Sequence, residues 1–87
     1  MRFERVWRRI ETHAGETFRQ TRGGEFTYGA RSGAVWPNRT TRAIPRSHFE
    51  QAFALVPLPS TTPLQRLQGS SYLYAILMDS RIRGDDW

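Results

Sequence analysis

The chain has 87 residues, carries thirteen basic and eight acidic side chains, and has a formal net charge of +5. This length allows one small domain and excludes two. The chain has no cysteine, which excludes a disulfide framework, a thiol nucleophile and a cysteine-ligated zinc site. Its aromatic residues (five Phe, three Trp and three Tyr) predict a packed core and not a disordered chain.

Residues 1–82 are expected to form one domain, followed by a flexible tail over residues 83–87. No apolar run approaches the roughly 18 residues of a membrane-spanning helix, and the first residues show no apolar signal region. We therefore expect a cytoplasmic protein that makes no membrane contact. These features are typical of small bacterial or phage domains.

The basic residues are all arginine, and they are unevenly distributed. Residues 1–46 hold ten arginines and four glutamates, a net charge of +6. Residues 47–87 hold three arginines and four acidic residues, a net charge of −1. A basic half beside a near-neutral half predicts one surface that meets an anionic partner. An ordinary solubilising surface can also carry a charge of this size.

Residues 2–14 predict an amphipathic helix. Apolar side chains recur at spacings of three and four residues, which places them along one face of a helix. These side chains are Phe3, Val6, Trp7, Ile10 and Ala14. Several arginines lie off this stripe, and Gly15 follows at a position where helices commonly end.

Residues 17–36 change to the alternating pattern of β-strands. The alternating runs are separated by Arg22-Gly23-Gly24 and Arg31-Ser32-Gly33, which are typical hairpin connections. We expect a three-stranded antiparallel meander with helices packed on one face, an α+β fold in the order α-β-β-β-α-α. The face toward the core should carry Phe18, Phe26, Tyr28 and Val35, and the open face Thr17, Arg19, Thr21, Thr27 and Trp36.

The second half of the chain is predicted to be mainly helical. Residues 38–44 are polar and predict an ordered loop or a short edge strand. Ser47 and Glu50 have the spacing of a capping box, which predicts a helix that starts at Ser47 and ends at Pro57. A short helix is expected over residues 62–67, where Pro63 suits a first turn.

A last helix is expected over residues 72–79, with Ser70 or Ser71 as its cap. The apolar run at its start would also suit a buried strand, but Leu73, Ile76 and Leu77 keep helical spacing. The predicted core consists of Trp7, Ile10, Phe18, Phe26, Tyr28, Phe49, Phe53, Leu73, Ile76 and Leu77.

The sequence shows no catalytic motif. His13 and His48 flank the predicted sheet and lack the short spacings of metal ligands. Lysine is absent, which excludes Schiff-base chemistry. We therefore expect no enzyme activity, no cofactor and no metal.

Arginine and short polar side chains concentrate on the predicted sheet and on the loop that follows it. Arginine neutralises phosphates and is the side chain that most often reads guanine, and a small sheet can enter the major groove. This pattern predicts nucleic-acid binding. Duplex DNA is favoured over RNA, because the predicted sheet aromatics lie on the core face and not on the open face. The candidate contact residues are Arg19, Thr21, Arg22, Thr27, Arg31, Trp36, Asn38, Arg39, Arg42 and Arg46.

A protein-interaction module without catalytic activity is the alternative, as an accessory subunit or as an antitoxin-like or phage-type inhibitor. The segment from Pro57 to Pro59 and the pair Tyr72 and Tyr74 could leave an apolar surface exposed. A homodimer across the last helix would double the basic surface. An exposed Trp36 would fit either function, because it could stack on a base or anchor a protein partner.

Overall fold

The computed structural model describes residues 1–87, and its first element is the predicted amphipathic helix, α1 (Phe3–Thr12). Its stripe is confirmed, since Val6, Trp7 and Ile10 are buried. After the helix the chain turns at Gly15, whose φ of +89° favours glycine. The Gly15 N–H donates to the carbonyl of Tyr28 over 2.8 Å, which ties the end of α1 to the sheet.

Two antiparallel ladders follow α1. The strands β1 (Phe18–Arg19) and β2 (Glu25–Phe26) pair with each other alone, and β3 (Tyr28–Arg31), β4 (Ala34–Pro37) and β5 (Ile44–Pro45) form a three-stranded sheet in that order. The α+β class and the three-stranded antiparallel sheet are confirmed. The predicted first strand, β1, lies outside this sheet, and β5 supplies the third strand instead. The observed order therefore has two more strands than α-β-β-β-α-α, and one further helix, α4 (Ser80–Arg83).

Thr27 separates β2 from β3 within the run that the sequence predicts as one strand. Its N–H donates to the side-chain oxygen of Asn38 over 2.9 Å, while the Asn38 N–H donates to the Thr27 carbonyl over 2.9 Å. A side-chain amide therefore takes the place of a backbone carbonyl in the ladder. The regular pairing ends there, and the hairpin of β1 and β2 is left as a separate unit.

The helix α2 (Arg46–Phe53) follows β5 directly and starts two residues earlier than a helix with Ser47 as its N-cap would. It ends at Phe53, before the predicted end at Pro57. Pro45 is its N-cap, and no side chain caps the helix, so the prediction of a capping box at Ser47 and Glu50 is wrong. Pairing with β4 holds the chain extended through Pro45, and the Arg46 N–H donates to the Gly33 carbonyl over 2.9 Å. Tertiary contacts thus fix the helix start before Ser47.

The C-terminal third contains a 3₁₀ turn, η1 (Thr62–Leu64), and two α-helices, α3 (Ser70–Leu77) and α4 (Ser80–Arg83). The choice of helix for the last apolar run is confirmed. The predicted cap at Ser70 or Ser71 is wrong, because Gly69 is the N-cap and the Ser71 hydroxyl accepts a hydrogen bond from Gln20 instead. The helix α4 was not expected from the sequence, although Asp79 caps it through the Arg81 N–H.

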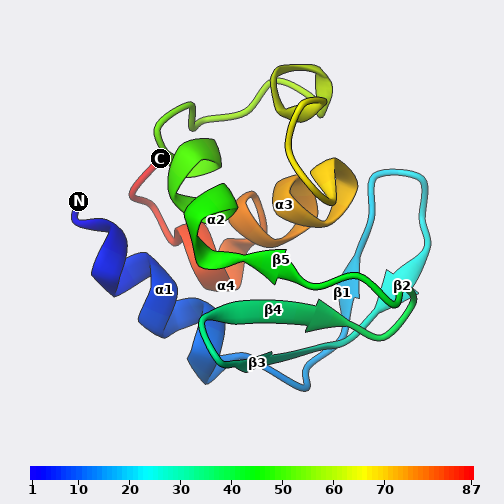
Figure 1. Cartoon of the computed structure of the whole chain (residues 1–87). Coiled ribbons are helices and arrows are strands. Elements are labelled where there is room, and N and C mark those ends of the chain that lie inside the picture. The colour runs from blue at the N-terminus through cyan, green and yellow to red at the C-terminus, as the bar shows by residue number, and fades with distance from the viewer.

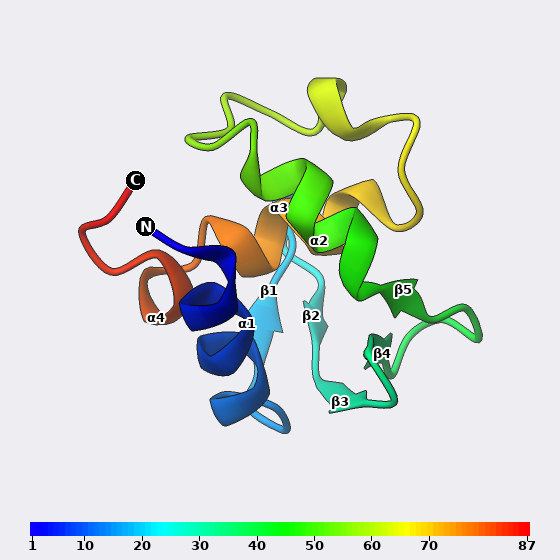
Figure 2. The ribbon, with the colours of Figure 1, turned by 60° about the vertical axis from the view of Figure 1, so that its left-hand side comes forward.

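The helices gather on one side of the three-stranded sheet, as Figures 1 and 2 show. The core lies between them, and nine of the ten predicted core residues are buried; Phe53 is partly buried and packs against the core. The sequence patterns do not indicate several residues that are buried in loops and short elements. These are Ile44, Leu58, Leu64, Leu67 and Ile82.

Residues 83–87 pack back onto the domain. The Trp87 indole N–H donates to the Leu77 carbonyl over 2.8 Å, and its ring lies 5.1 Å from that of Phe53. Asp86 pairs with Arg9 at 2.7 Å. The flexibility of this segment stays a prediction. None of the helices has the length and apolar character needed to cross a bilayer.

Candidate nucleic-acid interface

The hairpin of β1 and β2 and the loop between β4 and β5 meet at one end of the molecule (Figure 1). The Arg39 guanidinium on the loop donates to the Glu25 carbonyl on the hairpin over 3.4 Å. A Cβ at Gly24 would stand 2.9 Å from that guanidinium, so the glycine permits the close approach. We call Arg19, Arg22, Arg39 and Arg42, which these two segments carry, the basic end.

Acidic side chains neutralise little of the positive charge at the basic end. Arg19 pairs with Glu25 at 3.0 Å, but both side chains are mostly exposed, and such surface pairs contribute little. Arg22 and Arg42 are exposed and form no ion pair. Their charges are therefore available to an anion in solution.

The short polar candidates lie beside these arginines. Thr21 is exposed in the hairpin turn, and Thr27 and Asn38 face each other across the sheet end. The Asn38 side-chain oxygen is occupied by the Thr27 N–H, which leaves its amide NH₂ free as a donor. This end of the fold therefore presents neutral hydrogen-bond donors beside its arginines.

Arg31 and Trp36 lie elsewhere, on the open face of the three-stranded sheet. Trp36 pairs in register with Gly29, which has no side chain to lie against the ring, and the residue is 36% exposed. The Arg31 guanidinium stacks over the ring at 4.3 Å from its centroid, and the indole N–H donates to the Arg31 carbonyl over 3.3 Å. The exposed orientation of Trp36 agrees with the strand alternation.

Arg46 is turned away from both groups. Its guanidinium lies over Phe3 and Trp7, at 5.4 and 5.6 Å from the ring centroids, on the side of the molecule that α1 covers. The ten predicted contact residues thus divide into the basic end with its polar neighbours, the pair on the open sheet face, and the separate Arg46.

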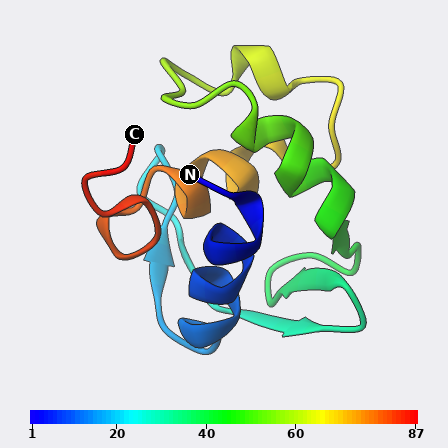
Figure 3. The ribbon, with the colours of Figure 1, turned by 90° about the vertical axis from the view of Figure 1, so that its left-hand side faces the viewer.

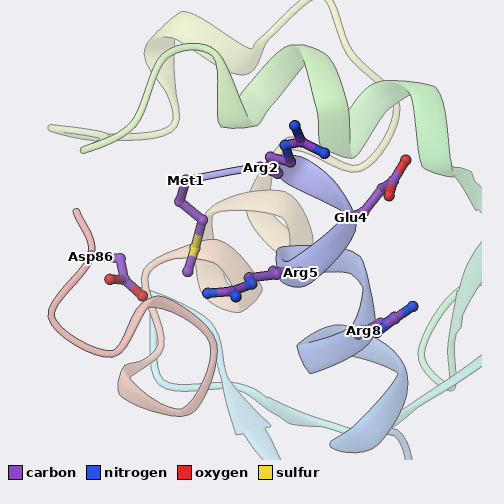
Figure 4. A pocket seen from close by; sticks show the side chains of 6 residues that line it. All are labelled: Met1, Arg2, Glu4, Arg5, Arg8 and Asp86. Atoms are coloured by element: carbon purple, nitrogen blue, oxygen red, sulfur yellow. The ribbon is translucent and has the colours of Figure 1, made fainter.

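A third group of arginines lies on the exposed side of α1. Arg2, Arg5 and Arg8 form no ion pairs, and they line a cavity of about 680 Å³ near the C-terminus (Figure 4). Their spacing of three residues, opposite the apolar stripe, is the sequence signal for this group, which the predicted contact residues do not include. Glu4 and Asp86 line the same cavity and oppose an anion there.

Arg81 is the arginine most tightly held within the fold. It contacts Glu16 at 3.1 Å and Asp79 at 2.9 Å, donates to the Thr17 carbonyl over 2.8 Å, and lies 3.8 Å from the Phe18 ring centroid. These partners occupy its donors, so Arg81 serves the fold and is not free for a ligand.

The Arg81 network also changes the pKa of its carboxylates. A hydrogen bond from His13 is the largest cause that lowers the pKa of Glu16, and Arg81 lowers it further. Burial raises the pKa of Asp79, but hydrogen bonds from Arg81 outweigh burial and leave that pKa below its usual value. Both groups therefore stay ionised to a lower pH than ordinary carboxyl groups do.

Neither histidine forms part of a metal-ligand cluster, and no group of three metal-ligating side chains occurs in the structure. His13 pairs with Glu16 at 3.0 Å, and the His48 ring accepts the Gln68 N–H over 3.0 Å, which ties α2 to the segment before α3. The site chemistry on the surface is that of guanidinium, hydroxyl and amide donors, which suits the recognition of anions.

No protein family, curated protein or solved structure matches the chain.

Proposed function

We propose that the protein is a small, non-enzymatic nucleic-acid-binding domain that contacts duplex DNA through the basic end. One observation carries the proposal. The segments 19–25 and 38–42 hold four arginines and one carboxylate, a net charge of +3 in two touching loops. The other seven acidic residues lie outside these segments. A cytoplasmic location accompanies this function.

The energetics of DNA binding favour such an arrangement. Each guanidinium that meets a phosphate releases condensed counterions, and this release provides most of the non-specific affinity. Thr21 and Asn38 add neutral donors at the same end, and side chains of this kind fix a protein's register on the phosphate backbone. Arg22 and Arg42 are exposed and have no ion-pair partner, so they are the most available of the four arginines to meet phosphates.

Duplex DNA is favoured over single-stranded RNA by the position of the aromatic rings. Sheets that bind single strands normally stack two or three bases on exposed aromatics. Here Trp36 is the one aromatic on the open sheet face, and Arg31 already covers it. Phe18, Phe26 and Tyr28 are buried.

The test is a charge-reversal pair with a matched control. Arg39→Glu with Arg42→Glu changes the net charge by −4 at the basic end, and Arg5→Glu with Arg8→Glu makes the same change on α1. Binding to a mixed-sequence duplex of about 20 base pairs is followed by fluorescence anisotropy at low salt. We expect the first pair to weaken binding at least about a hundredfold, since each charged hydrogen bond contributes roughly a factor of ten or more.

The control pair is expected to weaken binding far less. Equal losses in the two variants would show that net charge alone drives binding and would contradict a contact at the basic end. Circular dichroism of both variants checks that the fold is kept.

Trp36 supports a second candidate, a protein-interaction module. Exposed tryptophans are enriched at protein interfaces. Trp36 lies on the open face of the sheet, opposite Gly29 on the neighbouring strand. Trp36→Ala distinguishes the two functions. It should leave duplex binding nearly unchanged and should abolish binding to a protein partner that docks on the sheet.

A further inference from the structure

A small polar cavity lies between the turn of the β1–β2 hairpin and the start of α3. It encloses about 290 Å³ and has no apolar lining residue. Its lining consists of Gln20, Thr21, Arg22, Thr61 and Ser71. The volume corresponds to roughly ten water molecules and falls at the lower limit for drug-sized ligands, so the cavity suits a small polar group.

The donors of this cavity are free to act on a ligand. Arg22 forms no ion pair within the fold. The Ser71 hydroxyl accepts the Gln20 side-chain N–H over 3.0 Å, so its own hydrogen can be donated elsewhere. Thr21 and Thr61 add two more hydroxyls to the lining. One guanidinium and three hydroxyls form a donor set that matches the oxygens of a tetrahedral anion.

The hairpin side of the cavity is held in shape by its own backbone. The Gln20 N–H donates to the Gly24 carbonyl over 2.8 Å, and the Gly23 N–H donates to the Gln20 carbonyl over 2.8 Å. The Gln20–Ser71 bond then joins this turn to α3 across 51 residues of sequence. The backbone segments that carry the donors on the two sides are therefore held next to each other before a ligand arrives, which lowers the entropic cost of binding.

The larger cavity beside α1 is a poorer site for an anion. Glu4 and Asp86 stand among its arginines (Figure 4). No carboxylate lines the smaller cavity. The smaller cavity therefore has no negative group in its lining that would repel an anion, and this difference singles it out.

We propose that the cavity formed by Thr21, Arg22, Thr61 and Ser71 binds a phosphate group. The inference deepens the proposed function and rests on it for the source of the ligand, because Arg22 also belongs to the basic end. A phosphate could enter from the DNA backbone or from a phosphorylated 5′ end. The chemistry of recognition is the same for both sources.

The first test uses inorganic phosphate and the full chain. Phosphate is titrated at constant ionic strength against chloride, and backbone amide signals are followed by nuclear magnetic resonance. We expect saturable shifts confined to residues 20–22, 61 and 71. Arg22→Gln should weaken phosphate binding about tenfold, the usual effect of losing a charged hydrogen bond. Arg5→Gln, an equal charge change on α1, should leave it unchanged.

Non-saturable shifts spread over all surface arginines, equal in the wild type and Arg22→Gln, would overturn the proposal. The Arg22→Gln variant should keep its stability because the Arg22 side chain is exposed in a turn and makes no hydrogen bond in the fold. A thermal unfolding curve checks this, and Thr21→Val gives a second, uncharged change in the same lining.

The source of the phosphate is distinguished with two duplexes that differ only in a 5′-phosphate or a 5′-hydroxyl. Tighter binding of the phosphorylated duplex by the wild type, lost in Arg22→Gln, assigns the cavity to a terminal phosphate. Equal binding of both duplexes, weakened by Arg22→Gln, assigns it to the backbone. If phosphate alone binds at the cavity and neither duplex binds, the cavity stands and the proposed DNA function fails.

Discussion

Arg81 shows how a single residue joins distant parts of this chain. Its guanidinium bridges Asp79, at the start of α4, to Glu16, in the connection between α1 and β1. The same group covers the ring of Phe18. Because both carboxylates keep some solvent exposure, the charge pairs contribute modestly, and the hydrogen bonds and ring contact add to them.

Replacing Arg81 should therefore destabilise the fold. For Arg81→Ala we expect a loss of about 1–3 kcal/mol in the free energy of unfolding. The variant removes the ion-pair partner of Asp79 and the guanidinium that lies over the Phe18 ring. Urea denaturation followed by tryptophan fluorescence measures it. Arg66→Ala is the control, because the Arg66 side chain makes one exposed contact, to Gln51. Equal losses in the two variants would contradict a special role for Arg81.

The same network predicts a dependence of stability on pH. The folded-state pKa values of Glu16 and Asp79 lie below their usual values, about 4.3 and 3.9 in unfolded chains. The two carboxylates therefore stabilise the fold above about pH 4, and this contribution is lost as the pH falls through the lowered values. The difference in stability between the wild type and Arg81→Ala should shrink from pH 7 to about pH 3. A constant difference across that range would refute the coupling.

At the scale of elements, Gly69 fixes how α3 meets the sheet. Its φ of +71° starts the helix from a left-handed conformation, and a Cβ at this position would lie 2.6 Å from the Ile44 side chain. Ile44 is fully buried in β5 and cannot move aside without disturbing the core.

Gly69→Ala should therefore cost more than an ordinary glycine replacement. We expect a loss of about 2–4 kcal/mol, from backbone strain of about 1–2 kcal/mol together with overpacking. Gly15→Ala provides the matched comparison, since Gly15 also has a positive φ but no atom within 4 Å of the added Cβ. Chemical denaturation of both variants should show the larger loss at Gly69. A larger loss at Gly15 would contradict the close contact with Ile44.

The elements also show which features a sequence can predict. The helix α1 and the buried face of α3 were predicted because their apolar spacing is local. The start of α2 was predicted wrongly, because Pro45 is held by pairing between β4 and β5, a contact outside the helix itself. The separation of β2 from β3 depends on the Asn38 side chain, eleven residues from Thr27, and no alternation pattern signals it.

At the scale of the whole molecule, the sequence predicts which segments carry the candidate site better than it predicts how these segments are arranged. The sequence indicated which segments hold the arginines, and two of these segments do meet, through Arg39 and the hairpin. It did not indicate that Arg46 turns toward Phe3 and Trp7, because that orientation depends on how α1 packs against α2. The separate cavity beside Ser71 likewise arises from contacts between residues 51 positions apart.

The basic surfaces lie on different sides of a molecule that measures 29 × 25 × 21 Å. Figure 1 shows α1 on one side of the molecule and the β1–β2 hairpin on the other, and Figure 3 looks at the molecule from the α1 side. A duplex held at the basic end would therefore not reach the α1 arginines at the same time. This separation makes the α1 variants suitable controls for charge.

Contact between the basic end and DNA phosphates can be tested by the salt dependence of duplex binding. Fluorescence anisotropy of the wild-type protein with a duplex of about 20 base pairs gives Kd at about 50 and 200 mM salt. If the four arginines of the basic end each meet a phosphate, the affinity should fall roughly a hundredfold over this range. Absence of binding at the lower salt, or affinity that does not change with salt, would contradict a function based on contact between the basic end and DNA phosphates.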